Sequence, residues 1–479
     1  MILPKIEVRY LHFLIIFLLS IVIGFIFLNV NKDICMNGNV ARFHSEIGYN
    51  FYKENSVKVN YDRINYAHEF ITKEDKLLDY ADFDADAFDG NKTFLEPKDT
   101  VGYGVLLGLI WKITGSLRHR DIRILQIIIF SLIVVLFYMV VFLLFNSYSF
   151  SLLCSFLLLS FTPLSCLNAQ AHRDIWAFYG GVIILFSLLK FFKNNGSVFS
   201  LLIGGIAFTL CQWIRSPVFF CLPSLLIVFW FFYKKNFLKA FLVLGLVNVF
   251  LFWLPFAVYN KIAHGDYIAS CAGHGLLVGL GGKEKPNKWG FLWDDNDVAK
   301  FVKSRSGMDL KTHSIEYDAM AKQLFWELVR EDPKYFIGVL LSRTKEMFCC
   351  KFGFSFFLDN FMSGGGFLHK VKAALKEPVK FVLKLTDFIY NRLFFIELYV
   401  LLGWLGLLVM FFRKKYFETF IIFAAMAPFF AIFTSHIEGR YLIVVYWVLS
   451  IPLAYFLYCA KDLFLYVYSK VVNIISSHN

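Results

Sequence analysis

The chain has 479 residues, of which 58% are hydrophobic and 19% aromatic, and its mean hydropathy is +0.60. Soluble globular proteins contain about 45–50% apolar residues, so this composition excludes a water-soluble protein and indicates a membrane protein. The net charge of +12 would indicate a nucleic-acid partner in a soluble protein. Here the Lys and Arg residues gather at the ends of apolar stretches, as the positive-inside rule predicts. We therefore expect the lipid bilayer, and no nucleic acid, as a partner.

Apolar stretches long enough to cross a bilayer recur along the chain. About 20 apolar residues span the ~30 Å hydrocarbon layer as a helix. Ten such stretches lie near residues 10–29, 124–145, 149–168, 175–192, 198–214, 217–233, 237–259, 394–412, 416–434 and 441–460. The first is too long for the apolar region of a signal peptide and lacks a small-x-small cleavage pattern, so we expect a retained anchor. The sequence thus predicts an all-α polytopic membrane protein with about ten transmembrane helices, within a range of nine to twelve.

Basic residues predict the orientation of these stretches. They cluster at Lys5/Arg9, Lys190/Lys193, Lys234/Lys235/Lys239, Arg413/Lys414/Lys415 and Lys461. If the stretches alternate from a cytoplasmic N-terminus, all of these clusters fall on the cytoplasmic side, and the C-terminus lies there too. The opposite side then receives two long segments, 30–123 and 260–393, within a single membrane domain, 1–479.

Both long segments contain candidate helices that do not cross the bilayer. The apolar stretch 102–115 has only 14 residues, so we expect a helix at the membrane interface. Lys372, Lys376, Lys380 and Lys384 recur every four residues, which predicts a second, amphipathic interfacial helix. Met320, Leu324 and Leu328 also recur every four residues, which predicts a soluble helix that ends at Pro333.

Two further stretches attract attention by their composition. The Gly-rich stretch 273–290 lacks the GxxxxGK[ST] spacing of a phosphate-binding loop, and we interpret it as an ordinary loop. The acidic run "DYADFDADAFDG", 79–90, fails as an EF-hand counted from Asp82, because Ala87 and Thr93 stand where Gly and Glu are needed. As the Asp-x-Asp of a sugar-nucleotide transferase it would lie opposite the cytoplasm, where nucleotide sugars are. A solvated loop, a part of an acceptor entrance and a weak cation site stay open.

Charged residues gather at the predicted outer ends of the apolar stretches. They are Asp62 and Tyr66; His172, Arg173 and Asp174; Arg215; and His436, Glu438, Arg440 and Tyr441. Such residues are costly to bury unless paired, so they are functional candidates. Each group of charged residues alone could be an ion pair at the end of a helix. Their placement together on one side of the membrane favours a functional site. His172 and His436 lack a third ligand, so we expect no metal site; a divalent cation is not required.

The order of these residues matches a known pattern. A first apolar stretch is followed by Asp-x-x-x-Tyr-Ala from Asp62, "PKDTVGYGVLLGLIWKITG", "RILQ", Asp174, the Arg-x-Pro that starts at Arg215, and "EGRYLIVVYWVLSIPL". This order resembles the polytopic GT-C glycosyltransferases, in particular the bacterial branch related to protein O-mannosyltransferases and lipid A aminoarabinose transferases. The resemblance covers nearly the whole chain in element order, and its short motifs are specific only through that order.

The resemblance implies a sugar donor carried on polyprenyl phosphate and a glycolipid, lipopolysaccharide or protein acceptor on the non-cytoplasmic face of a bacterial inner membrane. It implies that Asp62 is the base for inverting transfer and that Asp174 is a second acidic position at the catalytic site. Arg215 and Arg440 would hold the lipid phosphate, with the other outer residues binding substrate and no cofactor. The chain departs from the commonest pattern at Arg63, where the family often has Glu after Asp, and at Pro97, which replaces a double proline.

Two other classes of membrane protein compete with this reading. A lipid-linked sugar transporter usually carries its charges near the bilayer midplane and often shows repeated halves, neither of which we find. A polysaccharide polymerase or ligase also has outer arginines, but the 94-residue segment after the first stretch favours a transferase.

Overall fold

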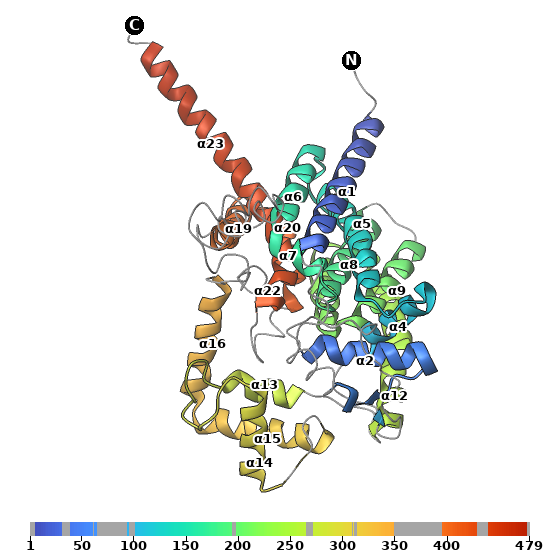
Figure 1. Cartoon of the computed structure of the whole chain (residues 1–479). Coiled ribbons are helices and arrows are strands. Elements are labelled where there is room, and N and C mark those ends of the chain that lie inside the picture. Colours follow the sequence, from blue (N-terminus) through green and yellow to red (C-terminus); the bar gives the residue numbers. More distant parts are fainter. Residues whose placement is uncertain are drawn as a thin grey trace, which may run out of the picture.

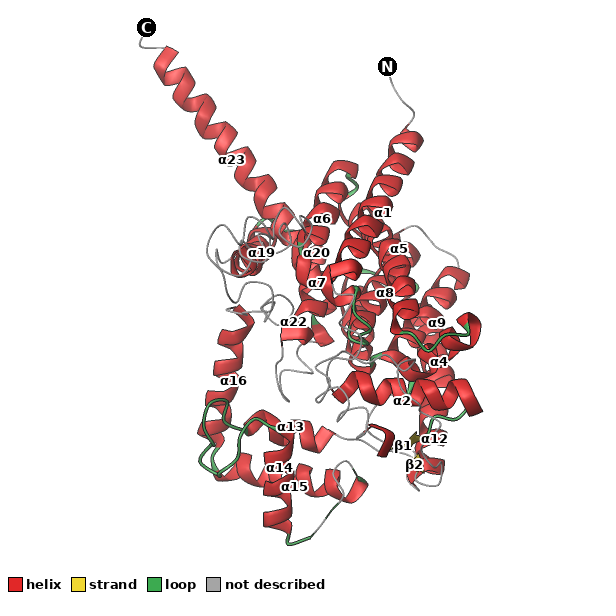
Figure 2. Ribbon diagram, viewed as in Figure 1, coloured by secondary structure: helices red, strands yellow, loops and turns green. Residues whose placement is uncertain are grey.

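A computed structural model describes residues 5–30, 39–60, 62–64, 93–94, 101–193, 198–264, 272–308, 310, 314–348, 395–428 and 439–476. Within these residues the protein is almost entirely helical (Figures 1 and 2). The acidic run 79–90, the predicted amphipathic helix around 372–384, and the site candidates Tyr66, His436 and Glu438 lie outside the described residues.

Most helices form one bundle (Figure 1). They are α1 (Lys5–Val30), α5 (His119–Phe145), α6 (Tyr148–Ser160), α7 (Thr162–Asn168), α8 (Ile175–Lys193), α9 (Val198–Ile214), η4 (Ser216–Phe220), α10 (Cys221–Phe232), α11 (Phe237–Asn248), η5 (Val249–Trp253), α12 (Leu254–His264), α19 (Phe395–Phe412), α20 (Tyr416–Ala425), α22 (Gly439–Tyr446), η8 (Trp447–Leu449) and α23 (Ser450–Ser476). Helix α5 packs against α1, α6 and α8, and α19 packs against α23. At the centre, the ring of Trp447 makes T-shaped contacts with Phe137 and Phe178, with ring centroids 5.8 and 5.5 Å apart.

Five described helices are long and apolar enough to cross a membrane. They are Val8–Asn29, His119–Phe145, Ile175–Lys193, Phe237–Ile262 and Leu442–Lys470; α6 and α7 add a sixth if they count as one span. Shorter apolar helices occupy the other predicted stretches, at Val198–Ile214, Ser216–Phe232, Glu397–Phe412 and Tyr416–Ala425. The chain is therefore an all-α membrane protein, and the count of ten spans stays a prediction.

The predicted stretch 149–168 is bent rather than straight. Helices α6 and α7 meet at an angle of 66°. Pro163 stands in the first turn of α7, where its missing N–H does no harm, whereas inside a continuous helix it would remove a hydrogen bond and clash with the preceding turn. The bend therefore has a local cause in the sequence.

A separate layer lies across one end of the bundle (Figure 1). It consists of α2 (Asn39–Glu54), α4 (Gly102–Thr114) and an antiparallel pair of short strands, β1 (Val59–Asn60) and β2 (Thr93–Phe94). Helices α2 and α4 approach closely because glycines face each other: a Cβ on Gly104 would lie 2.5 Å from Cβ of Ile47, and one on Gly108 would lie 2.6 Å from the Gly48 carbonyl oxygen. The helix predicted at 102–115 is confirmed as α4.

Four helices form a second unit with its own hydrophobic core. They are α13 (Ala272–Leu280), α14 (Asp295–Ser306), α15 (Ile315–Glu331) and α16 (Pro333–Phe348). The predicted helix around Leu324 and Leu328 is confirmed as α15, and both side chains are buried. The interpretation of 273–290 as a loop is wrong for its first half, because α13 is helical there. Gly273 lets α13 approach α15, since a Cβ would overlap the Asp318 carbonyl oxygen.

Candidate functional site

The ends of several helices meet at one end of the bundle. Nε of Arg215, directly after α9, lies 2.7 Å from Oδ1 of Asp174, directly before α8. Near the start of α5, Arg123 donates hydrogen bonds to the carbonyl oxygens of Ala169, after α7, and Leu28, near the end of α1, at 2.7 and 3.2 Å. The ends of α1, α7 and α9 and the starts of α5 and α8 therefore gather in one place.

Helix α4 begins at the same end. A Cβ at Gly102 would overlap the main-chain carbonyl of Trp213, two residues before Arg215, so only glycine fits at this contact. The hydroxyl of Tyr103 donates to Oε1 of Gln126 on α5 at 2.9 Å. We call this part of the molecule the α4 end of the bundle.

The pair of Asp174 and Arg215 is the centre of the candidate site. Their side chains are 2% and 12% exposed, so the two charges interact in a setting where water screens them little. The carbonyl oxygen of Asp174 accepts the N–H of Ala177 at 3.0 Å, in the first turn of α8. The carboxylate thus stands at a helix N-terminus, where the helix dipole favours negative charge.

His172 and Arg173 precede this carboxylate in the same loop. The N–H of Asp174 donates to Nδ1 of His172 at 3.2 Å. The same ring nitrogen lies 3.5 Å from Oδ2 of Asp174. Arg173 is buried, with 8% exposure. A second guanidinium group therefore belongs to the same loop.

A proline on the neighbouring span helps to hold Arg215 in place. Pro255 lacks an N–H, so the carbonyl oxygen of Leu251, four residues before it, loses its usual helical donor. The short π-helix η5 covers this region, and the indole Nε1 of Trp213 donates to the Leu251 oxygen at 2.7 Å. The end of α9 is thereby attached to the α11–α12 span two residues before Arg215.

Asp62 lies in the layer of α2 and α4, on a short helical turn, and is exposed. The side-chain Oδ1 of Asn60 accepts the N–H groups of Asp62 and Arg63 at 3.0 and 3.2 Å. This is the hydrogen-bonding pattern of an Asn that caps a turn. Asp62 therefore lies on an anchored turn at the surface.

The neighbouring Arg63 points into the protein instead. Its Nη1 lies 2.9 Å from Oε1 of Glu46 and 3.0 Å from Oδ1 of Asn50, and its guanidinium stacks over the ring of Tyr49 at 4.7 Å. Oε1 of Glu46 also accepts the N–H of Asn60 at 3.1 Å. Arg63, where the sequence departs from the commonest GT-C pattern, therefore anchors the turn through Glu46 and Asn50.

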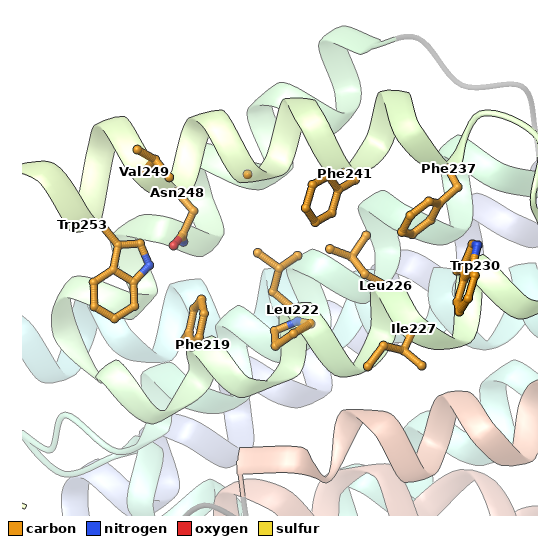
Figure 3. A pocket seen from close by; sticks show the side chains of 12 residues that line it. Phe219, Leu222, Leu226, Ile227, Trp230, Phe237, Phe241, Asn248, Val249 and Trp253 are labelled. Atoms are coloured by element: carbon orange, nitrogen blue, oxygen red, sulfur yellow. The ribbon is translucent and has the colours of Figure 1, made fainter.

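An apolar groove of about 340 Å³ lies beside η4 (Figure 3). One of its lining residues, Phe219, belongs to η4, which follows Arg215 directly in the sequence. The groove continues between α10 and α11 and is lined by Leu222, Pro223, Leu226, Ile227, Trp230, Phe237, Phe241, Gly245, Asn248, Val249 and Trp253. Of these, Trp230, Phe241 and Trp253 are among the exposed large apolar side chains of the surface.

The remaining site candidates are less well placed. Tyr66, His436 and Glu438 lie outside the described residues, and Arg440 and Tyr441 belong to the helical backbone of α22. Among the described residues, no three His, Cys, Asp or Glu side chains are grouped as a metal site requires. The structure therefore brings together His172, Asp174 and Arg215, and describes the Asp62 turn in the adjoining layer.

Sequence reasoning missed several residues that hold these groups in place. Glu46, Asn50 and Asn60 anchor the Asp62 turn, and nothing in their spacing distinguishes them from other loop residues. Gln126 could have been singled out, because it lies within an apolar stretch and its amide, which is wholly buried, is costly to bury unless it is hydrogen-bonded. Comparison with family models, curated proteins and solved structures gives no match for this chain.

Proposed function

We propose that the chain is an inverting glycosyltransferase that moves a sugar from polyprenyl phosphate to a glycolipid, lipopolysaccharide or protein acceptor. In this proposal it lies in a bacterial inner membrane with the α4 end facing the periplasm or the cell exterior. The observation that carries the proposal is the buried pair of Arg215 and Asp174, with the guanidinium of Arg173 in the same loop.

The charge of this cluster suits a phosphate group. Asp174 contributes one negative charge, and Arg173 and Arg215 contribute two positive charges, so these three residues carry a net positive charge. Guanidinium groups bind phosphate through parallel hydrogen bonds and keep their charge when buried. In the proposal Arg215 contacts the donor phosphate, and Asp174 fixes the orientation of that guanidinium instead of removing a proton. Arg440, which belongs to α22, is the other residue that the proposal assigns to the same phosphate.

The reaction requires a base and a stabilised leaving group. The acceptor hydroxyl or amine attacks the anomeric carbon, the bond from that carbon to the phosphate oxygen breaks, and polyprenyl phosphate leaves with the bonding electrons. The Asp62 carboxylate takes the acceptor proton. Fixed cations stabilise the negative charge that develops on the phosphate. No redox partner or cofactor is needed for this balance.

The apolar groove provides room for the carrier lipid. Its lining residue Phe219 stands four residues after Arg215 in the sequence, and in the proposal a hydrocarbon chain between α10 and α11 extends from a phosphate at Arg215. Exposed aromatic side chains at its edge suit contact with lipid. In the proposal the groove would hold part of a long polyprenyl chain, and the rest would stay in the bilayer.

The proposal is tested in cells that lack the chain and are complemented with variants. Mass spectrometry of surface glycolipids and glycoproteins compares the wild type, Asp62→Asn and Glu54→Gln, an exposed carboxylate at the end of α2. We expect one sugar to be missing without the chain, restored by the wild type and by Glu54→Gln, and not by Asp62→Asn expressed at the same level. Identical glycans with and without the chain would overturn the proposal, and restoration by Asp62→Asn would remove Asp62 as the base.

A further inference from the structure

Two buried polar side chains on α5 have no part in the chemistry described so far. Arg123 and Gln126 belong to the "RILQ" stretch and are 1% and 0% exposed. Burying such groups in an apolar helix is costly unless they are hydrogen-bonded. Their partners therefore indicate what they do.

Both side chains hold the backbone that follows α7. Nε2 of Gln126 donates to the carbonyl oxygens of Asn168 and Gln170 at 3.0 and 2.7 Å. Nε of Arg123 donates to the carbonyl oxygen of Ala169 between them at 2.7 Å. Three consecutive carbonyl groups are thus held by two side chains of one helix. We call these contacts the loop clamp.

The amide of Gln126 is itself fixed in one orientation. Its two N–H groups point at carbonyl oxygens, so its Oε1 must face a donor, and the Tyr103 hydroxyl supplies one at 2.9 Å. Burial raises the pKa of Tyr103 well above its usual value, so this hydroxyl stays protonated. The hydroxyl of Tyr179 lies 2.6 Å from Oδ1 of Asn168 and 3.1 Å from the carbonyl oxygen of Gln126.

The loop clamp satisfies one carbonyl group that a short helix leaves open. The last carbonyl groups of a helix have no partner within it, and the carbonyl of Asn168, the last residue of α7, accepts from Gln126. The carbonyl oxygen of Gln170 also accepts the N–H of His172 at 2.8 Å. The N–H of Asp174 in turn donates to the His172 ring. A continuous series of hydrogen bonds therefore runs from Gln126 to Asp174.

We propose that Gln126 is a positioning residue that sets the loop 168–174 so that Asp174 meets Arg215 and aims its guanidinium at the donor phosphate. Arg123 and Tyr103 support it from either side. This inference rests on the proposed function. A displacement of about 1 Å in a positioned group can reduce a rate about a hundredfold.

The test uses the purified full chain in lipid vesicles with a polyprenyl-phosphate sugar as donor. Gln126→Met keeps the length of the side chain and removes its donors, and Tyr103→Phe removes only the hydroxyl that orients Oε1. Ser131→Ala is the matched control, because Ser131 is a buried hydroxyl of the same helix whose only described bond is to the Ile127 carbonyl oxygen. Thermal unfolding, kcat and the KM for the donor are measured for each.

We expect Gln126→Met to lower kcat/KM by about ten- to a hundredfold, with a smaller loss in the same direction for Tyr103→Phe and none for Ser131→Ala. The decisive measurement is the effect of the same substitutions on kcat/KM when Arg215 is replaced by Lys. A residue that acts through Arg215 loses most of its effect on kcat/KM there, whereas a merely structural residue keeps the same effect in both backgrounds.

The outcomes separate the two proposals. A wild-type chain that transfers no sugar from any polyprenyl phosphate contradicts the proposed function. Two results with an active wild type overturn the positioning role alone. In one, Tyr103→Phe has the same kcat/KM as Ser131→Ala; in the other, Gln126→Met lowers kcat/KM by the same factor in the wild-type and the Arg215→Lys backgrounds. If Gln126→Met does not fold, the kcat/KM of Tyr103→Phe is compared in the same two backgrounds and tests the positioning role instead.

Discussion

Nε of Arg215 lies 2.7 Å from Oδ1 of Asp174, and the two side chains join the end of α9 to the start of α8. Removing one partner of a buried ion pair leaves an uncompensated charge and costs about 3–5 kcal/mol. We therefore expect Asp174→Asn to lower the stability by about 3 kcal/mol, measured as a fall in the thermal unfolding midpoint in detergent. Asp297→Asn is the control, because its pair with Lys300 is exposed and contributes about 0–1 kcal/mol. Equal midpoints for both variants would contradict this account of the buried pair.

Arg215→Lys tests the shape of the cation, since it keeps the charge and loses the planar fork that binds phosphate. Hydrogen bonds to charged groups contribute about 1.5–3 kcal/mol. We expect the KM for a polyprenyl-phosphate donor to rise by about ten- to a hundredfold, with an unchanged unfolding midpoint. Arg413→Lys, an exposed position, should have no effect on KM. A donor KM that is the same in both variants would remove Arg215 from the phosphate site.

The Arg63 and Glu46 pair predicts an asymmetry between single and double variants. Their side chains are 6% and 0% exposed, so Arg63→Met alone leaves a buried carboxylate without its cation and should be strongly destabilising. Replacing both with Met removes both charges and should recover much of the loss. The unfolding midpoints of the two single variants and the double variant measure this. Additive losses would show that the pair is not coupled.

The crossing of α2 and α4 predicts a steric effect. A Cβ at Gly104 would lie 2.5 Å from Cβ of Ile47, so Gly104→Ala should separate the helices and cost about 1–3 kcal/mol. Gly338→Ala in α16 is the matched control, because no atom lies within 4 Å of its added Cβ, and alanine there should be neutral or stabilising by up to about 1 kcal/mol. Hydrogen exchange of the α2 amides should rise only in Gly104→Ala. Faster exchange in both variants, or in neither, would contradict the close crossing.

Helices were the part of the fold that the sequence could predict. The apolar stretches that form α5, α8 and α11 are long enough to identify by hydropathy alone, and the four-residue repeat of α15 predicted a helix correctly. Helix α13 was missed because glycines disfavour helix in isolation, while close packing of Gly273 against α15 overrides that preference. The bend at Pro163 has a visible cause, but its angle depends on packing.

From the sequence, the candidate site could be predicted only as a set of residues on one side of the membrane, without the contacts between them. Alternation of spans places Asp174 and Arg215 on the same side, and the structure adds that their side chains touch. We expect that contact to depend on Trp213, Gly102 and the loop clamp, which are tertiary features that no local pattern encodes. For the same reason the sequence could not show that Arg63 turns inward to pair with Glu46.

The most direct test of the proposed function is transfer by the purified chain in vesicles. Sugars labelled with ¹⁴C are supplied on polyprenyl phosphate, on polyprenyl pyrophosphate or on a nucleotide, with an acceptor extract from cells that lack the chain. We expect label to reach the acceptor from polyprenyl phosphate alone, and to be lost in Asp62→Asn but not in Glu54→Gln. Transfer from the pyrophosphate donor alone, or passage of the lipid-linked sugar across the vesicle without transfer, would contradict the account.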